Sequence, residues 1–190
     1  MAGLDDSIAN LERRKKDLEN YSYIINTCRL TDISCDEAFQ RKFTYFYRVR
    51  RDSTWRQAYY SLFEENKEFK EVTFDSILRS IFEHTGRIEA SFASKMLATL
   101  KPEMPIWDSI VLSKLGIKPC QSLNKETRLL KTVGIYDSIV AWYETFNLSP
   151  EAQRFVEAFD RAFPEFKGFS KMKKIDFLIW GSGDTDPFVK

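Results

Sequence analysis

The amino-acid sequence predicts an all-α fold, and three observations support this prediction. Apolar residues recur at the spacing of an amphipathic helix along almost the whole chain of 190 residues. Asp or Ser precedes many of these apolar runs, and Gly or Pro follows several of them, as is typical of helix ends. β-branched residues never alternate with polar ones over the length of a strand. The length and a hydrophobic fraction of 43% indicate one packed domain, residues 1–190.

The predicted helices follow one another with short connections. The first spans residues 4–26, where leucine and isoleucine recur on one face. The second lies within residues 33–49, with Asp32 or Ser34 as its cap, and the third, residues 54–67, follows an Asp-Ser cap. Further helices are predicted near residues 73–84, 88–100, 109–115, 123–146, 150–162 and 170–180.

The composition argues against several classes of protein. The cysteines Cys28, Cys35 and Cys120 form no close pair, and His84 is the single histidine, so we expect no metal site, no disulfide framework and no cofactor. Charged residues interrupt every apolar stretch, and the amino terminus lacks the apolar centre of a secretory signal. These features predict a cytoplasmic protein that does not enter a membrane.

Charge is segregated locally although the net charge is only +1. The stretch RKFTYFYRVRRDSTWR, residues 41–56, carries six basic residues against one acid. A surface that binds anions therefore has to come from such local clusters rather than from the field of the whole protein.

One carboxylate stands at an unusual place in the stretch ASFASKMLATLKPEMPIWDSIVLSKLGIKP, residues 90–119. A helix ends near Pro102, a stiff turn follows to Pro105, and Asp108 precedes a short apolar helix that Gly116 ends. The helix dipole and the backbone amides are expected to lower the pKa of Asp108 and keep it ionised. Such a carboxylate suits the stabilisation of a cation, although Asp108 as a cap alone is the alternative.

The segment FASKMLATLKPEMPIWDSIVLSKLGI resembles the helix-hairpin-helix DNA glycosylase superfamily, in which the aspartate after a proline turn is catalytic. A second likeness is YFYRVRRDSTWRQAYYSLF, which has the layout of an early helix pair joined by a loop with an acidic end. The resemblance covers roughly residues 36–118. It implies a compact bilobed helical domain of this glycosylase type, with one lobe of about 36–118 and a second lobe from 1–35 and 119–190.

The resemblance also implies a set of DNA-contacting residues. The family hairpin has two glycines, whereas TGRIEAS keeps only Gly86, so Arg87 and Lys95 are expected to hold the DNA phosphate instead. Arg50 and Arg51 are candidates for the wedge that fills the gap left by an everted base. The predicted DNA-binding residues are Arg50, Arg51, Arg87, Ser91 and Lys95.

A lysine nucleophile is the mark of family members that also cleave the strand, and Ser91 stands at its position here. The resemblance therefore implies a monofunctional enzyme. Lys95 lies one helical turn further on, where it is a phosphate contact, a solvated charge or a Schiff-base lysine. Aromatic stacking surface for the base is assigned to Trp107, Trp55, Tyr47 and Tyr59, for which the alternative is a place in the core.

The function predicted from these features is excision of a modified base from double-stranded DNA, with Asp108 as the catalytic residue. The enzyme is expected to flip the base out and hydrolyse its N-glycosidic bond, which leaves an abasic site. The resemblance favours antiviral defence through a hypermodified base of phage DNA, such as glucosylated hydroxymethylcytosine. A noncatalytic DNA-binding module and a helical protein-interaction domain are the alternatives, and the sequence indicates no oligomeric state.

Overall fold

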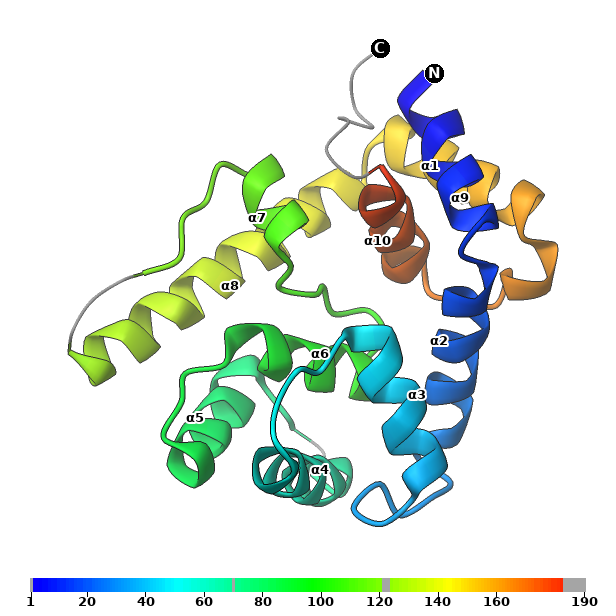
Figure 1. Ribbon diagram of the computed structural model, residues 1–190. Helices are drawn as coiled ribbons and strands as arrows, with labels where there is room; N and C mark the ends of the chain where they lie inside the picture. The colour runs from blue at the N-terminus through cyan, green and yellow to red at the C-terminus, as the bar shows by residue number, and fades with distance from the viewer. Residues whose placement is uncertain (1, 70, 121–123, 183–190) are drawn as a thin grey trace.

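Every element of secondary structure among the described residues is a helix, which confirms the all-α prediction. The computed structural model describes residues 2–69, 71–120 and 124–182. Figure 1 shows its elements, which are α1 (Ala2–Glu12), α2 (Lys15–Thr27), α3 (Glu37–Tyr47), α4 (Ser53–Lys67), α5 (Phe74–Thr85), α6 (Ala90–Leu100), α7 (Ser109–Lys114), α8 (Lys125–Asn147), α9 (Pro150–Ala162), η1 (Pro164–Phe166) and α10 (Lys171–Gly181). Within the described ranges, no helix is long and apolar enough to cross a membrane.

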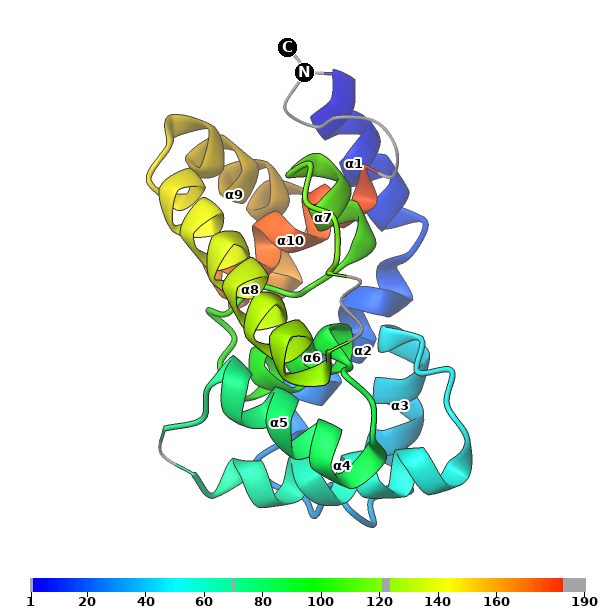
Figure 2. The ribbon, with the colours of Figure 1, turned by 90° about the vertical axis from the view of Figure 1, so that its left-hand side faces the viewer.

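The helices gather in two groups. Figures 1 and 2 both show α3, α4, α5 and α6 at one end of the molecule and α1, α7, α9 and α10 at the other. The long helix α8 runs from the first group to the second, and α2 joins α1 to the end where α3 lies. Although the predicted first lobe included α7, this helix packs against α10 in the second group.

Two helix starts differ from the sequence prediction. The single helix expected over residues 4–26 is wrong, because the chain leaves helical geometry at Arg14 (φ −117°, ψ 26°) between α1 and α2. The cap of α3 is Asp36, not Asp32 or Ser34, since its carboxylate accepts hydrogen bonds from the amides of Ala38 and Phe39. Asp32 instead closes its own turn by accepting from the Ser34 amide and hydroxyl.

Helices α1 and α10 pack closely, which fixes α10 in the molecule. A Cβ atom at Gly181 would lie 2.8 Å from the backbone oxygen of Ser7 and 3.1 Å from Leu11 Cγ. The Asn10 side chain donates to the Gly181 carbonyl oxygen at 2.9 Å. Because only glycine allows this approach, the α1–α10 contact has little freedom to shift.

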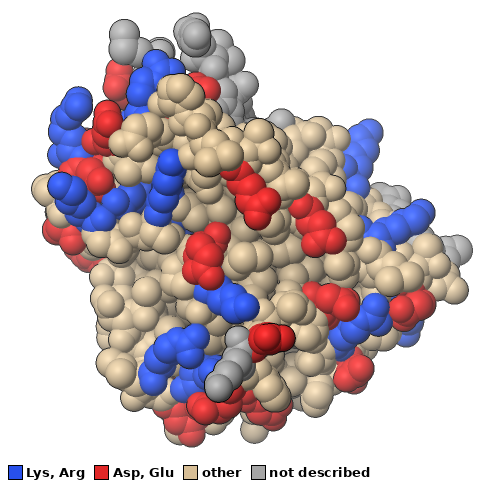
Figure 3. Space-filling model, turned by 180° about the vertical axis from the view of Figure 1, so that it is seen from behind, with Lys and Arg blue, Asp and Glu red and all other residues tan. Residues whose placement is uncertain are grey.

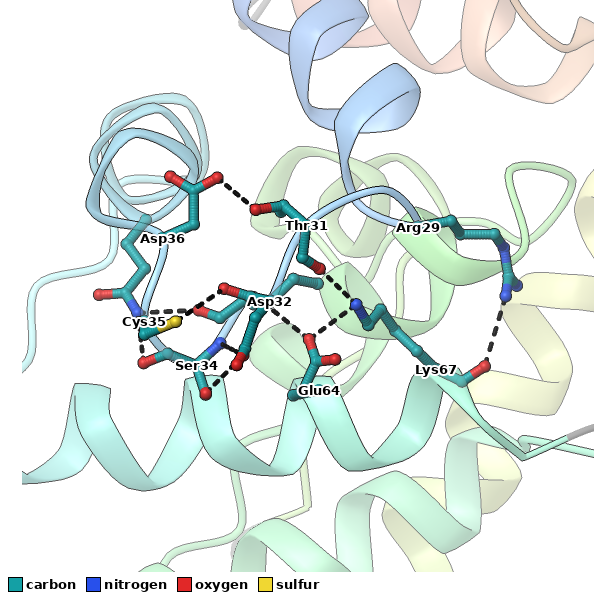
Figure 4. Close-up of polar contacts among 10 residues, drawn as sticks. Arg29, Thr31, Asp32, Ser34, Cys35, Asp36, Glu64 and Lys67 are labelled. Atoms are coloured by element: carbon teal, nitrogen blue, oxygen red, sulfur yellow. Dashed lines mark hydrogen bonds and ion pairs between the residues drawn. The ribbon is translucent and has the colours of Figure 1, made fainter.

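Polar contacts hold the connection between α2 and α3 against α4 (Figure 4). The Ile33 amide donates to Glu64 Oε2 at 2.7 Å, and Lys67 donates to the Thr31 carbonyl oxygen at 2.5 Å. The Thr31 hydroxyl in turn donates to the Asp36 carboxylate at 2.7 Å. The start of α3 is thereby fixed, and with it the direction in which α3 runs toward the second group of helices.

Candidate functional site

The segment before α7 is held from two sides. The Ser94 hydroxyl of α6, which is completely buried, accepts a hydrogen bond from the Trp107 amide at 2.9 Å. The Tyr136 hydroxyl of α8 donates to the Pro105 carbonyl oxygen at 2.8 Å. Since both anchors lie within three residues of Asp108, they fix where its carboxylate can reach.

Asp108 is the N-cap of α7, as predicted. Its backbone is extended (φ −127°, ψ 152°), and its Oδ1 accepts a hydrogen bond from the Ile110 amide at 2.7 Å. Helix α7 has only six residues, so its dipole is weak and the cap contributes little electrostatic stabilisation beyond this one hydrogen bond.

A cavity of about 330 Å³ opens beside Asp108, where the two groups of helices meet. Its wall is built by the end of α3, by α6, by the start of α7 and by α10. The polar side chains among the lining residues are Tyr47, Arg48, Lys95, Asp108, Lys173 and Asp176, together with Ser109. The carboxylate of Asp108 is therefore part of a concave site with both acidic and basic groups.

The expectation that the pKa of Asp108 is lowered is wrong, because burial outweighs the effect of the capping amide. Burial raises the pKa of this half-buried carboxyl above its ordinary value, because desolvation disfavours the charged form. The Ile110 amide and the ammonium groups of Lys95 and Lys173 act in the opposite direction, whereas Asp176 adds to the rise. An Asp in such an environment exchanges a proton more readily than an exposed cap does.

Lys95 lies in the cavity rather than on an open DNA-facing surface. Its ammonium donates to the Tyr47 carbonyl oxygen at 3.2 Å. Burial lowers the pKa of Lys95 to about 8, although the negative charge of Asp108 opposes this shift. Lys95 and Asp108 therefore form an electrostatically coupled pair in which each favours the charged form of the other.

A second ionic pair on α10 lines the same cavity. Lys173 Nζ lies 2.7 Å from Asp176 Oδ2, and the Tyr143 hydroxyl of α8 donates to Asp176 Oδ1 at 3.3 Å. Lys173 is buried, so it is not a solvated surface charge. In the sequence, this ion pair is indicated only by two opposite charges three residues apart inside an apolar run.

Arg48, which the sequence analysis did not assign to the site, stands at the wall of the cavity with its side chain exposed. It ends α3 in the left-handed conformation (φ 52°), and the Val49 amide donates to the Thr44 carbonyl oxygen at 3.0 Å. Glycine is usual at this position, since a side chain in this conformation costs about 1–2 kcal/mol. Backbone strain of this kind is common at functional sites.

Arg51, one of the two predicted wedge residues, forms an ion pair with Glu89. Its guanidinium makes a bidentate contact with Glu89, with Nη2 at 2.8 and 2.9 Å from the two carboxylate oxygens. This pair joins the α3–α4 loop to the α5–α6 turn, which brings the exposed Arg50 and Arg87 onto adjoining loops. Ser91, by contrast, is half-buried in α6, and its carbonyl oxygen accepts from the Ser94 hydroxyl.

All four predicted pocket aromatics are core residues, and three of them do not line the cavity. Trp55 and Tyr59 stack on each other with ring centroids 4.9 Å apart, and Trp107 stacks on Phe74 at 6.3 Å. All three are at least 93% buried, at exposed fractions of 6%, 0% and 7% respectively, and they do not line the cavity. Tyr47 does line it, so the aromatic surface for a ligand differs from the one expected.

The face of the molecule that lies behind the view of Figure 1 has no uniform charge. Figure 3 shows Lys and Arg interspersed with Asp and Glu across it. In the described part of the chain, no group of three or more His, Cys, Asp or Glu side chains is placed to hold a metal ion. The cavity beside Asp108 is therefore the candidate functional site.

Comparisons of the chain with protein-family models, with curated proteins and with solved structures gave no match.

Proposed function

We propose that the protein is a monofunctional DNA glycosylase that excises a modified base from double-stranded DNA. The observation that supports this proposal best is the placement of Asp108, which a rigid segment holds at the wall of a cavity, coupled to Lys95. A cap without another role needs neither the cavity nor the ammonium group. The helix-hairpin-helix glycosylase type of the fold is part of the same proposal.

The chemistry follows from the charge that develops during bond breakage. As the N-glycosidic bond breaks, its electron pair leaves with the base, and positive charge builds on C1′ of the sugar. The Asp108 carboxylate stabilises this charge, and it then takes a proton from the water whose oxygen bonds to C1′. That proton passes to the departing base, so the products are a neutral base and an abasic sugar.

Lys95 has a positioning role in this mechanism. Burial alone would leave the Asp108 carboxyl protonated more often, but the neighbouring ammonium favours its charged form. Because the pKa of Lys95 is about 8, this ammonium is charged in most molecules at neutral pH. The pair thus keeps a reactive carboxylate available inside a partly desolvated site.

The presence of an exposed arginine at the cavity wall supports the same function. A base inside a duplex has to be everted before it reaches an enclosed carboxylate, and this requires cationic residues near the opening. Arg48 stands at the cavity wall, and Arg50 and Arg87 are exposed on loops joined by the Arg51–Glu89 pair. We propose Arg48, with Arg50, as the residues that meet the opened duplex, while Arg51 fixes the loop.

For the substrate we propose a modified cytosine of phage DNA, such as glucosylated hydroxymethylcytosine, and hence a role in antiviral defence. The cavity volume of about 330 Å³ lies within the range of about 300–1,000 Å³ typical of small-molecule sites. Arg48, which lines the cavity, has an exposed side chain, and we propose that a bulky substituent on the base lies beside it.

The test is incubation of the protein with duplexes that carry ordinary, damaged or glucosylated bases, and with phage-derived DNA. Released base is measured by mass spectrometry, and abasic sites are measured as strand breaks after alkali. The proposal expects release from at least one modified duplex, loss of release in Asp108→Asn, and full release in Asp36→Asn, a matched change at a cap that does not line the cavity. Salt-dependent DNA binding without release from any substrate would indicate a noncatalytic DNA-binding module instead.

One observation favours an alternative to the monofunctional enzyme, namely a glycosylase that also cleaves the DNA strand. A lysine in the cavity with a pKa near 8 provides a neutral amine in a sizeable fraction of molecules at pH 8. That amine can add to the C1′ aldehyde of the abasic sugar with loss of water, and the imine promotes strand cleavage. Borohydride traps such an imine as a covalent protein–DNA complex, which wild type should form and Lys95→Met should not. If wild type forms no such complex, the enzyme only releases the base.

A further inference from the structure

Helix α10 contributes to two ion pairs, Lys173–Asp176 and Lys174–Asp160, and the two pairs differ in the elements that they join. Lys174 Nζ lies 2.7 Å from Asp160 Oδ1, and this pair joins α10 to α9. Lys173 and Asp176 lie on the same helix, three residues apart, with 7% and 10% of their side chains exposed. Their salt bridge lies within one helix, so it does not join α10 to a second helix as the Lys174–Asp160 pair does.

Burying such a pair is costly, because the desolvation of both ions offsets their attraction. The ammonium of Lys173 is surrounded by aromatic rings, with the centroids of Tyr21 and Phe177 at 4.8 and 4.7 Å. The Tyr143 hydroxyl holds the Asp176 carboxylate from α8. Several elements thus fix a donor and an acceptor side by side on the wall of the cavity that contains Asp108.

We infer that Asp176 and Lys173 select a base that carries an exocyclic amino group beside an unprotonated ring nitrogen, as in cytosine. The Asp176 carboxylate accepts from the amino group, and the Lys173 ammonium donates to the ring nitrogen or to the adjacent carbonyl oxygen. A uracil-type base presents a carbonyl oxygen and a ring N–H at these positions, so acceptor meets acceptor and donor meets donor. This inference rests on the proposed function and names the substrate class of that site.

The test compares two duplex substrates, 5-hydroxymethylcytosine and 5-hydroxymethyluracil, which differ in the group on C4, amino or carbonyl, and in whether N3 carries a hydrogen. For wild type we expect kcat/KM to favour the cytosine-type base by about 10- to 100-fold, the effect of one good pair of base contacts. Asp176→Asn should reduce this ratio to unity or reverse it, because an amide can donate to the carbonyl of the uracil type. Asp160→Asn, the control in the other α10 pair, should leave the ratio unchanged.

A second measurement does not depend on catalysis. Free cytosine and free uracil are titrated into the protein, and the indole resonance of Trp180, which lines the cavity, is followed by NMR. We expect cytosine to shift this resonance at lower concentration than uracil does, and Asp176→Asn to remove or reverse that order.

The outcomes separate the inference from the proposed function. Excision with a ratio that Asp176→Asn leaves unchanged overturns the inference alone. Preferential cytosine binding that depends on Asp176, with no excision of any base, overturns the glycosylase proposal and supports the recognition site. No excision and no binding overturn both. If Asp176→Asn does not fold, the same ratio of kcat/KM values is measured for Lys173→Met. This variant removes the donor to the ring and should lower the preference for the cytosine-type base.

Discussion

Asp36 and Asp108 are both aspartates that cap a helix, yet their surroundings give them opposite properties. Asp36 Oδ1 accepts from the amides of Ala38 and Phe39 at 2.9 and 3.0 Å, and Asp108 Oδ1 accepts from the Ile110 amide at 2.7 Å. The hydroxyl of Thr31 and the backbone amides lower the pKa of Asp36. Burial raises the pKa of Asp108. The cap motif alone therefore does not tell whether a carboxylate is structural or chemically active.

The difference lies in what meets the rest of each carboxylate. In Asp36, the other oxygen accepts from the Thr31 hydroxyl at 2.7 Å, and the surrounding contacts belong to the α2–α3 connection (Figure 4). Asp108 instead borders a cavity together with Lys95 and the α10 pair. The first carboxylate is fully used by the fold, whereas the second is held by the fold and still open to a ligand.

The largest effect that tests this comparison is on base release. Asp108→Asn is expected to lower kcat/KM by about 10²- to 10⁴-fold, because it removes the carboxylate that stabilises the sugar cation and accepts the proton. Asparagine caps helices as well as aspartate does, so the fold is kept. Asp36→Asn should change kcat/KM by less than about twofold, since Asp36 is remote from the cavity lining. Equal rates in both variants and wild type would show that Asp108 is only a cap.

The next effect concerns the charge beside Asp108. Lys95→Met removes an ammonium that lowers the pKa of Asp108, so the acid limb of the pH profile of kcat/KM should move to higher pH. A shift of one unit costs about tenfold on that limb. The alkaline limb near pH 8, which reports loss of the Lys95 proton, should disappear.

Lys101→Met is the control for this change, because Lys101 donates to the Val72 carbonyl oxygen at 2.8 Å and does not line the cavity. Its pH profile should overlay that of wild type. A Lys95→Met profile that also overlays wild type would mean that the two groups in the cavity are not coupled during the reaction.

The sequence predicted the features that depend on near neighbours along the chain. Helical periodicity, the Asp108 cap and the end of α6 at Lys101 follow from local patterns, and the structure has them. The break at Arg14 and the cap at Asp36 were missed, because several residues nearby suit these positions equally well. The glycosylase type of the all-α fold stays a prediction.

The site was predicted less well, since it depends on contacts between distant segments. Nothing in the local sequence indicated that Lys173 and Asp176 face the cavity with Asp108, about 65 residues earlier in the chain. For the same reason, Trp107 was predicted to line a base pocket, whereas it stacks on Phe74 in the core. Aromatic and charged residues carry the same local signal in both situations, and only the packing separates them.

A smaller effect extends the comparison from helix starts to helix ends. Helices α3 and α5 both end in the left-handed conformation, at Arg48 (φ 52°) and at Gly86 (φ 68°). Arg48→Gly should raise the free energy of unfolding by about 0.5–1 kcal/mol and yet weaken duplex binding at low salt, because strain and a cationic contact are lost together. Gly86→Ala should lower the free energy of unfolding by about 1 kcal/mol.

Urea unfolding and a salt titration of binding measure both effects for Arg48→Gly and Gly86→Ala. If Arg48→Gly gains stability without losing affinity for a duplex, the strained conformation has no role in binding. A loss of stability in Arg48→Gly would show instead that the arginine side chain contributes more to the fold than the strain costs.

The smallest effect is the pH dependence of stability at the two caps. The lowered pKa of Asp36 means that its contribution is present above about pH 4, the unfolded value, and is lost as pH falls through the folded pKa. Asp36→Asn should therefore cost up to about 0.5 kcal/mol at pH 7 and nothing at low pH, since solvent screens this partly exposed group.

Asp108 should show the opposite sign. Its raised pKa means that its contribution is fully present below the unfolded pKa and is lost as pH rises through the folded pKa. At pH 7 the folded protein therefore bears the cost of a partly desolvated charge, and Asp108→Asn should unfold at a higher urea concentration than wild type. This gain should shrink toward pH 4. A loss of stability in Asp108→Asn at pH 7 would show that the capping amide and the neighbouring ammonium groups outweigh the desolvation of this carboxylate.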